Sequence, residues 1–147
     1  MVISDFLSRP GVLVNVRTKD KNDLIEALAR VLAPEADIPA NHVIAELLKR
    51  EELGSTGMGD GVAIPHARFQ EIKKPIGVMA KLKPPIDFDA IDGQPVDLVF
   101  VLLLPATAEG EQLGALACAA RKLRSPDALT RLRRAKSADE LYEAVTG

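Results

Sequence analysis

The sequence predicts an α/β fold with a mixed sheet, and three observations carry this prediction. Short apolar runs typical of strands alternate along the chain with longer segments whose apolar residues recur at helical spacing. Residues 97–104 (DLVFVLLL) form the most apolar run, as expected for a central strand buried on both faces. Asp92-Gly93 is a turn signal between two of the expected strands, which indicates that some neighbouring strands are antiparallel.

The N-terminal half is expected to supply one strand and two helices. Residues 12–16 (VLVNV) are typical of a strand. Thr18 is expected to cap a first helix that runs to Pro34. Pro39 is expected to open a second helix, which Gly54 closes. The inward faces of these helices consist of apolar residues at helical spacing, namely Leu24, Ile25, Leu28, Val31 and Leu32, then Val43, Ile44, Leu47 and Leu48.

The C-terminal half is expected to supply two strands and three helices. The expected elements are strands over 76–82 and 97–104, and helices over 109–124, 126–133 and 138–145. Pro84-Pro85 and Pro105 are expected to end the two strands, because proline has no backbone N–H to donate. Ser125 and Ser137 are expected to begin the last two helices. The first of these helices has its expected inward face on Leu113, Leu116, Ala117, Ala120 and Leu123.

The composition excludes several classes of function. With 147 residues, of which 47% are hydrophobic and 27% charged, the chain suits one globular domain over 1–147. A net charge of -2 and an aromatic content of 3% predict no nucleic-acid partner. No signal-peptide pattern is evident and no apolar run reaches about 18 residues, so no membrane partner is expected. Cys118 cannot form an internal disulfide, so we expect a small buried residue in a reducing, cytoplasmic compartment.

Residues 53–69 (LGSTGMGDGVAIPHARF) carry the strongest signs of a site. Their dense glycines permit positive φ, so the backbone N–H groups of this loop can turn toward an anion. Residues 62–64 are typical of a short strand that Pro65 ends, which places His66 at a strand end beside the loop. A neutral imidazole there is a candidate nucleophile, and the alternative is a structural or surface histidine. The other histidine, His42, is expected to be an exposed residue with no chemistry.

Two sets of basic residues have two interpretations each. Arg50 lies in the last turn of the second expected helix, just before the glycine loop. Its guanidinium can hold a phosphoryl group on His66 with paired donors, or can complement the negative end of the helix. Residues 121–136 contain seven basic side chains against Asp127 alone, which fits either a solvated helical face or a docking patch.

Three motifs carry a family resemblance. They are Arg50-Glu51, Gly54-Ser55-Thr56-Gly57 and Gly61-Val62-Ala63-Ile64-Pro65-His66, the last being highly specific. Together they resemble the phosphorylation-site signature of the enzyme IIA proteins of the bacterial sugar phosphotransferase system. The resemblance is to the mannitol/fructose class, especially its nitrogen-regulatory branch, and covers essentially the whole chain. It implies a mixed sheet of about five strands flanked by helices.

The resemblance also implies a mechanism. His66 would take a phosphoryl group on Nε2 from a histidine-containing phosphocarrier protein, with no metal or cofactor. Arg50, the hydroxyls of Ser55 and Thr56, and loop N–H groups would hold the phosphoryl oxygens. Many members have a second histidine where this chain has Gln112, whose amide can donate a hydrogen bond but cannot take up a proton. A surface polar residue is the alternative for Gln112.

Three functions stay open at this point. The first is a regulatory protein of the nitrogen-related phosphotransferase system, phosphorylated on His66 and binding its regulatory target proteins according to its phosphorylation state. The second is a sugar-transport enzyme IIA component that passes the phosphoryl group to a separate acceptor domain. The third is a protein-binding module with a vestigial site. The sequence contains no acceptor or membrane domain, which favours the regulatory protein.

Overall fold

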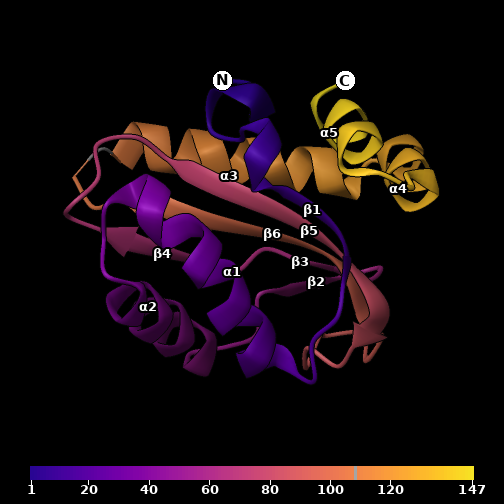
Figure 1. Ribbon diagram of the computed structural model, residues 1–147, viewed down its shortest axis with the longest axis horizontal. Coiled ribbons are helices and arrows are strands. Elements are labelled where there is room, and N and C mark those ends of the chain that lie inside the picture. Colours follow the sequence, from indigo (N-terminus) through magenta and orange to yellow (C-terminus); the bar gives the residue numbers. More distant parts are fainter. Residues whose placement is uncertain (108) are drawn as a thin grey trace.

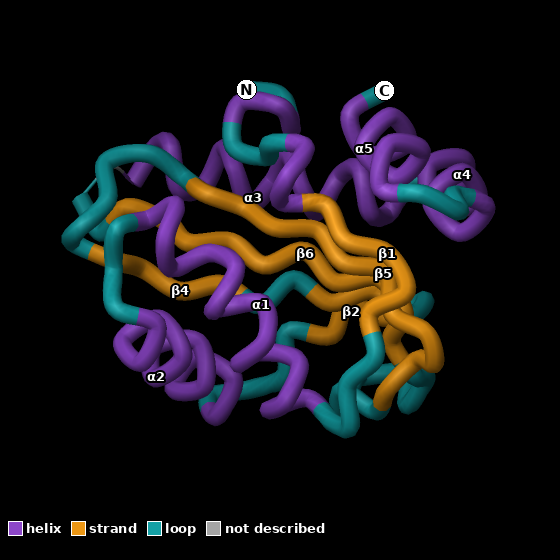
Figure 2. The backbone as a smooth tube through the Cα atoms, viewed as in Figure 1, coloured by secondary structure: helices purple, strands orange, loops and turns teal. Residues whose placement is uncertain are grey.

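A six-stranded mixed sheet separates two layers of helices (Figures 1 and 2). The structure, a computed structural model, describes residues 1–107 and 109–147, and all their side chains except those of 109–113. The strands are β1 (Val12–Val16), β2 (Gly57–Gly59), β3 (Val62–Ala63), β4 (His66–Phe69), β5 (Ile76–Ile86) and β6 (Val96–Pro105). Their order is β1-β5-β6-β3-β2, and β4 also pairs with β6. The expected α/β class is confirmed, with six strands where about five were expected.

Parallel and antiparallel pairs are both present. β5 and β6 are antiparallel, whereas β1 lies parallel to β5, and β3 and β4 lie parallel to β6. The expected turn between β5 and β6 is present, because the N–H of Gly93 donates to the carbonyl of Ala90 at 2.9 Å. The predicted mixed sheet is therefore confirmed.

Two layers of helices cover the two faces of the sheet. One layer contains α1 (Lys21–Ala36) and α2 (Ala40–Glu52), and the other contains α3 (Glu109–Arg124), α4 (Pro126–Arg134) and α5 (Ala138–Thr146). Short 3-10 turns over Ile3–Asp5 and Arg9–Gly11 precede β1. Figure 1 shows both chain ends on the side of the sheet that carries α3 to α5. Within the described residues, none of these helices is both long and apolar enough to cross a lipid bilayer.

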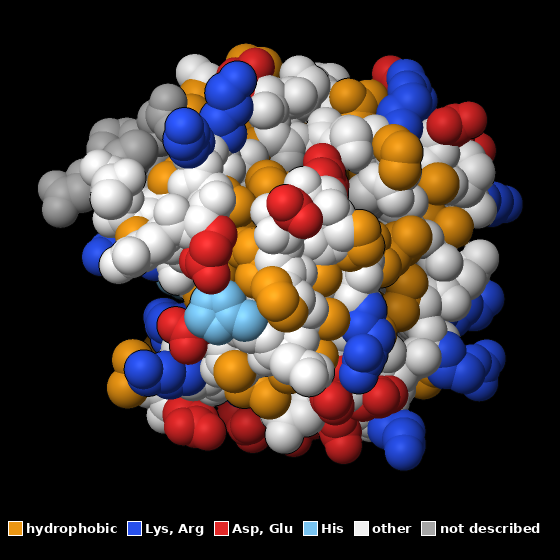
Figure 3. Space-filling view, turned by 60° about the vertical axis from the view of Figure 1, so that its left-hand side comes forward, with side chains coloured by type: hydrophobic (Ala, Val, Ile, Leu, Met, Phe, Trp, Pro, Cys, Tyr) orange, Lys and Arg blue, Asp and Glu red, His pale blue; other side chains and the backbone are white. Residues whose placement is uncertain are grey.

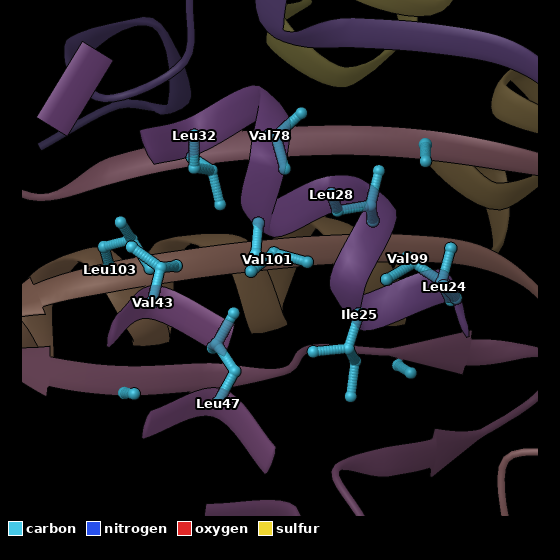
Figure 4. Close-up of a cluster of buried hydrophobic side chains, with 14 of the residues drawn as sticks. Leu24, Ile25, Leu28, Leu32, Val43, Leu47, Val78, Val99, Val101 and Leu103 are labelled. Carbon is cyan, nitrogen blue, oxygen red and sulfur yellow. The ribbon is translucent and has the colours of Figure 1, made fainter. Parts of the chain in front are cut away.

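Strand β6 supplies side chains to a separate apolar core on each side of the sheet. Val99, Val101 and Leu103 pack under α1 and α2, and Figure 4 shows Val99 beside Leu24 of α1 and Leu103 beside Val43 of α2. The alternate residues Leu98 and Phe100 pack under α3 to α5. The expectation that this strand is buried on both faces is confirmed, since side chains alternate along a strand.

Four local expectations were wrong. Val31, expected on the inward face of α1, is exposed. The N-cap of α1 is Asp20, whose carboxylate accepts from the N–H of Asp23, two residues after the expected Thr18. Pro34 lies inside the last turn of α1, where its missing donor costs one hydrogen bond without ending the helix. β5 continues through Pro84-Pro85, because the pairing register between β5 and β6 shifts there and the ladder needs no donor from these residues.

The inward face of α3 is also displaced from the expected one. Ala115, Ala119 and Leu123 are buried, whereas Ala117 is exposed. Cys118 is half-buried rather than fully buried, and its thiol lies 3.5 Å from the carbonyl of Met1. The side chain of Leu113 lies outside the described residues.

Candidate functional site

The glycine-rich stretch forms the hairpin of β2 and β3. Asp60 and Gly61, between the two strands, have φ of 57° and 80°, as tight hairpin turns require. The N–H groups of Thr56, Gly57 and Asp60 donate to side chains of the protein itself. The expectation of a loop whose N–H groups hold an anion was therefore wrong for these three groups. The dipeptide Asp60-Gly61 is the sequence signal that would have predicted a hairpin.

His66 lies just after a break between β3 and β4. Ile64 and Pro65 interrupt the edge of the sheet, and both strands keep the same register on β6. The carbonyl of Pro65 accepts from the N–H of Leu102 at 2.9 Å, so the backbone stays attached to β6 across the break. His66 is the first residue of β4 and is half-buried. The sequence placed it correctly just after a short strand, but β4 itself was not predicted.

The ring of His66 has a defined tautomer. Nδ1 lies 2.8 Å from the carbonyl oxygen of Ile64. A carbonyl can only accept, so Nδ1 carries the hydrogen and Nε2 of the neutral ring keeps its lone pair. Nε2 has no hydrogen bond to any residue that the structure describes. The geometry therefore leaves Nε2 as the nucleophilic atom of the ring.

The environment of His66 favours the neutral ring. Burial lowers the pKa of His66 below its ordinary value of 6.5, and the positive charges of Arg50 and Arg68 act in the same direction. The carbonyl of Ile64 and the carboxylate of Glu51 oppose this lowering of the pKa. The environment of the ring therefore favours its neutral form, in which Nε2 keeps its lone pair.

His66 lines a pocket of about 380 Å³ together with side chains from α2, β4, β6 and α3. The other lining residues are Glu46, Lys49, Arg50, Leu53, Ala67, Arg68, Leu104 and Leu116. Three cations therefore surround a cavity of a size that accepts a small anionic group. Arg50 also donates from Nη1 to the carbonyl of Gly54 at 2.9 Å, so it caps the end of α2 and lines the pocket at once.

Ser55 and Thr56 do not line this pocket. The hydroxyl of Ser55 donates to the carbonyl of Phe88 at 2.7 Å. The buried hydroxyl of Thr56 lies 2.7 Å from Oε2 of Glu51, to which it donates. Each hydroxyl has a single hydrogen, which is used inside the protein here. Their expected contact with phosphoryl oxygens stays a prediction.

Two further residues that the sequence singled out are Gln112 and His42. The side chain of Gln112 lies outside the described residues, so its expected place beside His66 also stays a prediction. His42 is exposed, as expected, and its Nε2 lies 3.1 Å from a carboxylate oxygen of Glu71. His42 is not among the residues that line the pocket of His66.

The basic stretch over 121–136 is mostly solvated. Arg121, Arg124, Arg131 and Arg134 are exposed. Arg133 has a structural role that the sequence did not predict, because it pairs with Asp97 at 3.0 Å and ties α4 to the start of β6. On the face drawn in Figure 3, basic and acidic side chains lie side by side. Within the described residues, no three His, Cys, Asp or Glu side chains are grouped as metal ligands.

The whole chain is similar to one family of known proteins. The family described as "Phosphoenolpyruvate-dependent sugar phosphotransferase system, EIIA 2" matches residues 5–147. The chain belongs to this enzyme IIA family. It is 44% identical over 147 residues to a nitrogen regulatory protein of Pseudomonas aeruginosa, with 99% of this chain and 96% of that protein covered.

Two further relatives point to the same branch of the enzyme IIA family. A nitrogen regulatory protein of Escherichia coli K12 is 39% identical over 145 residues, which cover 98% of this chain and 89% of that protein. The crystal structure of nitrogen regulatory protein IIA-Ntr from Neisseria meningitidis matches with a TM-score of 0.93 and 35% identity, covering 98% of this chain and 99% of that chain. The expected resemblance to the nitrogen-regulatory branch is confirmed.

Sequence reasoning about this enzyme IIA chain missed the groups beneath the site. Glu51 is only 8% exposed, and its carboxylate accepts from the N–H and the hydroxyl of Thr56. Lys21, at the start of α1, places Nζ 3.1 Å from the same carboxylate and 4.8 Å from the centre of the Phe88 ring. Glu51 was visible in the Arg50-Glu51 motif, but nothing in the sequence connected it with Lys21, which is 30 positions earlier.

Proposed function

We propose that this protein accepts a phosphoryl group on Nε2 of His66 from a histidine-containing phosphocarrier protein. The observation that carries the proposal is the hydrogen bond from Nδ1 to the Ile64 carbonyl, which leaves Nε2 unprotonated beside a pocket lined by cations. The lone pair of Nε2 forms the new N–P bond as the N–P bond of the donor breaks. The donor imidazole keeps the released electron pair, and Nδ1 of His66 keeps its proton throughout.

Positive charge in the pocket supports the transfer. Phosphoryl transfer depends mainly on positioning and on stabilising the charge spread over the phosphoryl oxygens. Lys49, Arg50 and Arg68 line the pocket with His66 and supply that charge. Arg50 is the strongest candidate among them, because a guanidinium can donate two parallel hydrogen bonds to one phosphoryl group.

We further propose that the phosphorylation state of His66 controls binding to regulatory target proteins. The addition of a phosphoryl group offsets most of the positive charge that Lys49, Arg50 and Arg68 give the pocket, and so changes the surface that a partner meets. The similarity to relatives named nitrogen regulatory protein supports a regulatory role over a sugar-transport role. We expect this exchange in the cytoplasm, where a phosphocarrier protein would supply the phosphoryl group.

The first prediction tests the proposed acceptor. His66→Ala should abolish phosphoryl uptake from a phosphorylated phosphocarrier protein, and should leave the far-ultraviolet circular dichroism unchanged because the side chain is only half-buried. His42→Ala is the matched control and should be labelled like the unmodified protein. The adduct should be acid-labile and should map to His66 by mass spectrometry of peptides prepared at alkaline pH.

Three outcomes would contradict this assignment. Labelling that persists in His66→Ala would place the acceptor elsewhere, and loss of labelling in His42→Ala would make His42 part of the path. No labelling of the unmodified protein by an active donor would indicate a vestigial site. Onward transfer to an added sugar-specific acceptor domain would favour the transport role over regulation.

A further inference from the structure

A continuous chain of hydrogen bonds runs from α1 to the ring of His66. Lys21 Nζ lies 3.1 Å from Oε1 of Glu51, and the same oxygen accepts from the N–H of Thr56 at 2.7 Å. The carbonyl of Thr56 accepts from the N–H of Ile64 at 3.1 Å. The carbonyl of Ile64 then accepts from Nδ1 of His66 at 2.8 Å. The hydroxyl of Thr56 adds a second contact to the first link, because it donates to the other oxygen of Glu51, Oε2, at 2.7 Å.

The first links of this chain are buried. Glu51 is 8% exposed and Thr56 is 7% exposed. A buried carboxylate is costly unless charged and polar partners satisfy it, and here Lys21 and both donors of Thr56 do so. With three donors converging on it, the carboxylate of Glu51 has one arrangement that leaves no partner unsatisfied. Thr56 is therefore fixed relative to the last turn of α2.

The middle links pass this constraint across the hairpin of β2 and β3. Thr56 directly precedes the pairing of the two strands, and Ile64 directly follows it. The hydrogen bond from Ile64 N–H to Thr56 C=O closes the open end of the hairpin. It also determines where the next peptide, which carries the Ile64 carbonyl, can lie. Pro65 follows at once, and its fixed φ limits the alternatives for this peptide.

We propose that Glu51 and Thr56 are positioning residues that hold the Ile64 carbonyl in place and thereby select the Nδ1–H tautomer of His66. A histidine without such an acceptor can carry its proton on either ring nitrogen. The tautomer with the proton on Nε2 has no lone pair on the atom that faces phosphoryl transfer. The consequence for transfer rests on the proposed function, whereas the effect on the tautomer does not.

The decisive experiment compares Thr56→Val with Thr56→Ser. Valine has nearly the shape of threonine but no hydroxyl, and serine restores the hydroxyl. The ¹⁵N chemical shifts of both ring nitrogens of His66 are measured in the unphosphorylated protein, at a pH above the lowered pKa of the ring. The unmodified protein and Thr56→Ser should show one protonated nitrogen, Nδ1. In Thr56→Val the two shifts should move toward each other as both tautomers become populated.

Phosphoryl uptake from a phosphorylated phosphocarrier protein is the second readout. Thr56→Val should slow uptake about fivefold to tenfold, the effect of one buried hydrogen bond, and Thr56→Ser should restore the rate. Glu51→Gln should slow uptake in the same way, because an amide cannot accept from all three donors at once. Lys21→Met should also slow uptake, because it removes the positive charge that pairs with the carboxylate of Glu51. Lys19→Met is the matched control, since Lys19 is exposed, and it should leave the uptake rate unchanged.

Each outcome decides the proposal. Ring shifts in Thr56→Val that equal those of the unmodified protein would overturn it. Changed shifts with an unchanged uptake rate would support the positioning of His66 and overturn its consequence for transfer. If Glu51→Gln fails to fold, the comparison of valine with serine at position 56 still decides. If the unmodified protein takes up no phosphoryl group, the proposed function fails, and the ring shifts still test the positioning of His66.

Discussion

Arg50 combines two contacts in one guanidinium. Nη1 donates to the carbonyl of Gly54, which supports the turn at the end of α2. The rest of the group lines the pocket beside His66, where its charge contributes to the lowered pKa of the ring. The two interpretations that the sequence left open for Arg50 are therefore compatible, and the capping contact keeps the side chain where a phosphoryl group would need it.

Replacement of Arg50 separates these contacts. Arg50→Ala should slow phosphoryl uptake by removing a charge-assisted contact, an effect of about 1.5–3 kcal/mol at most. The pKa of His66 should rise toward its ordinary value, because a nearby positive charge that disfavours the imidazolium is lost. Uptake rates and the titration of the ring by NMR provide the two measurements. Arg50→Lys keeps the charge without the paired donors. Its uptake rate should lie between that of the unmodified protein and that of Arg50→Ala.

Unchanged uptake in Arg50→Ala would leave Arg50 with its capping role alone. A pKa of His66 that falls further in this variant would show that the guanidinium does not act on the ring through its charge.

Gln112 allows a test of pH dependence. With Gln112 in place, phosphoryl uptake should rise with pH along the single deprotonation of His66, and this rise should lie below pH 6.5 because the pKa of the ring is lowered. Gln112→His should add a second titrating imidazole, so that the apparent pKa values belong to the pair. Uptake rates over about pH 5.5–8.5, with the integrity of the donor checked separately, provide the comparison. Superimposable profiles would place Gln112 outside the site.

At the scale of single elements, sequence patterns correctly predicted the bounds of helices and strands that depend on neighbouring residues. The bounds of β1 and α3 and the start of α4 agree with the expected ones, because strand alternation, helical spacing and a capping serine are encoded within a few residues. The extension of β5 through Pro84-Pro85 depends on a register shift against β6, which local sequence does not contain. The place of His66 just after a short strand was predicted in the same way as the local elements, since its motif is contiguous. The Glu51–Lys21 pair was missed because α1 and α2 bring it together only in the fold.

A glycine in β5 provides a test of packing between elements. A Cβ atom at Gly77 would lie 2.7 Å from Cε1 of Phe100 and 3.2 Å from the carbonyl oxygen of Phe6. Gly77→Ala should therefore lower the free energy of unfolding by about 1–3 kcal/mol, the usual cost of overpacking a filled core. Urea unfolding followed by circular dichroism measures this change.

Gly114→Ala is the matched control for this substitution. Its new Cβ would have only the flexible side chain of Met1 within reach, at 3.7 Å, and alanine favours the helix α3. Equal or greater stability is expected for Gly114→Ala. A Gly77→Ala protein as stable as the unmodified one would show that Phe100 can move aside without loss.

At the scale of the whole molecule, the candidate site lies at the edge of a sheet whose central strand is buried on both faces. β6 has partners on both of its edges and an apolar core on each of its faces. β4, which carries His66, is held by β6 on one edge and by α2 beyond it. Burial of the centre provides most of the stability, because the two cores remove most of the large apolar side chains from water.

The central position of β6 has a consequence for the exchange of amide hydrogens with deuterated water. Amides of β6 should exchange only when the whole sheet unfolds, whereas those of β4 should exchange through a smaller opening that leaves β6 paired to β5. Native-state exchange measured residue by residue should give β4 a lower opening free energy than β6, and equal values would indicate that the two strands open together. The strand that carries His66 would then adapt to a docking protein at little cost, while the amides in the rest of the sheet stay protected from exchange.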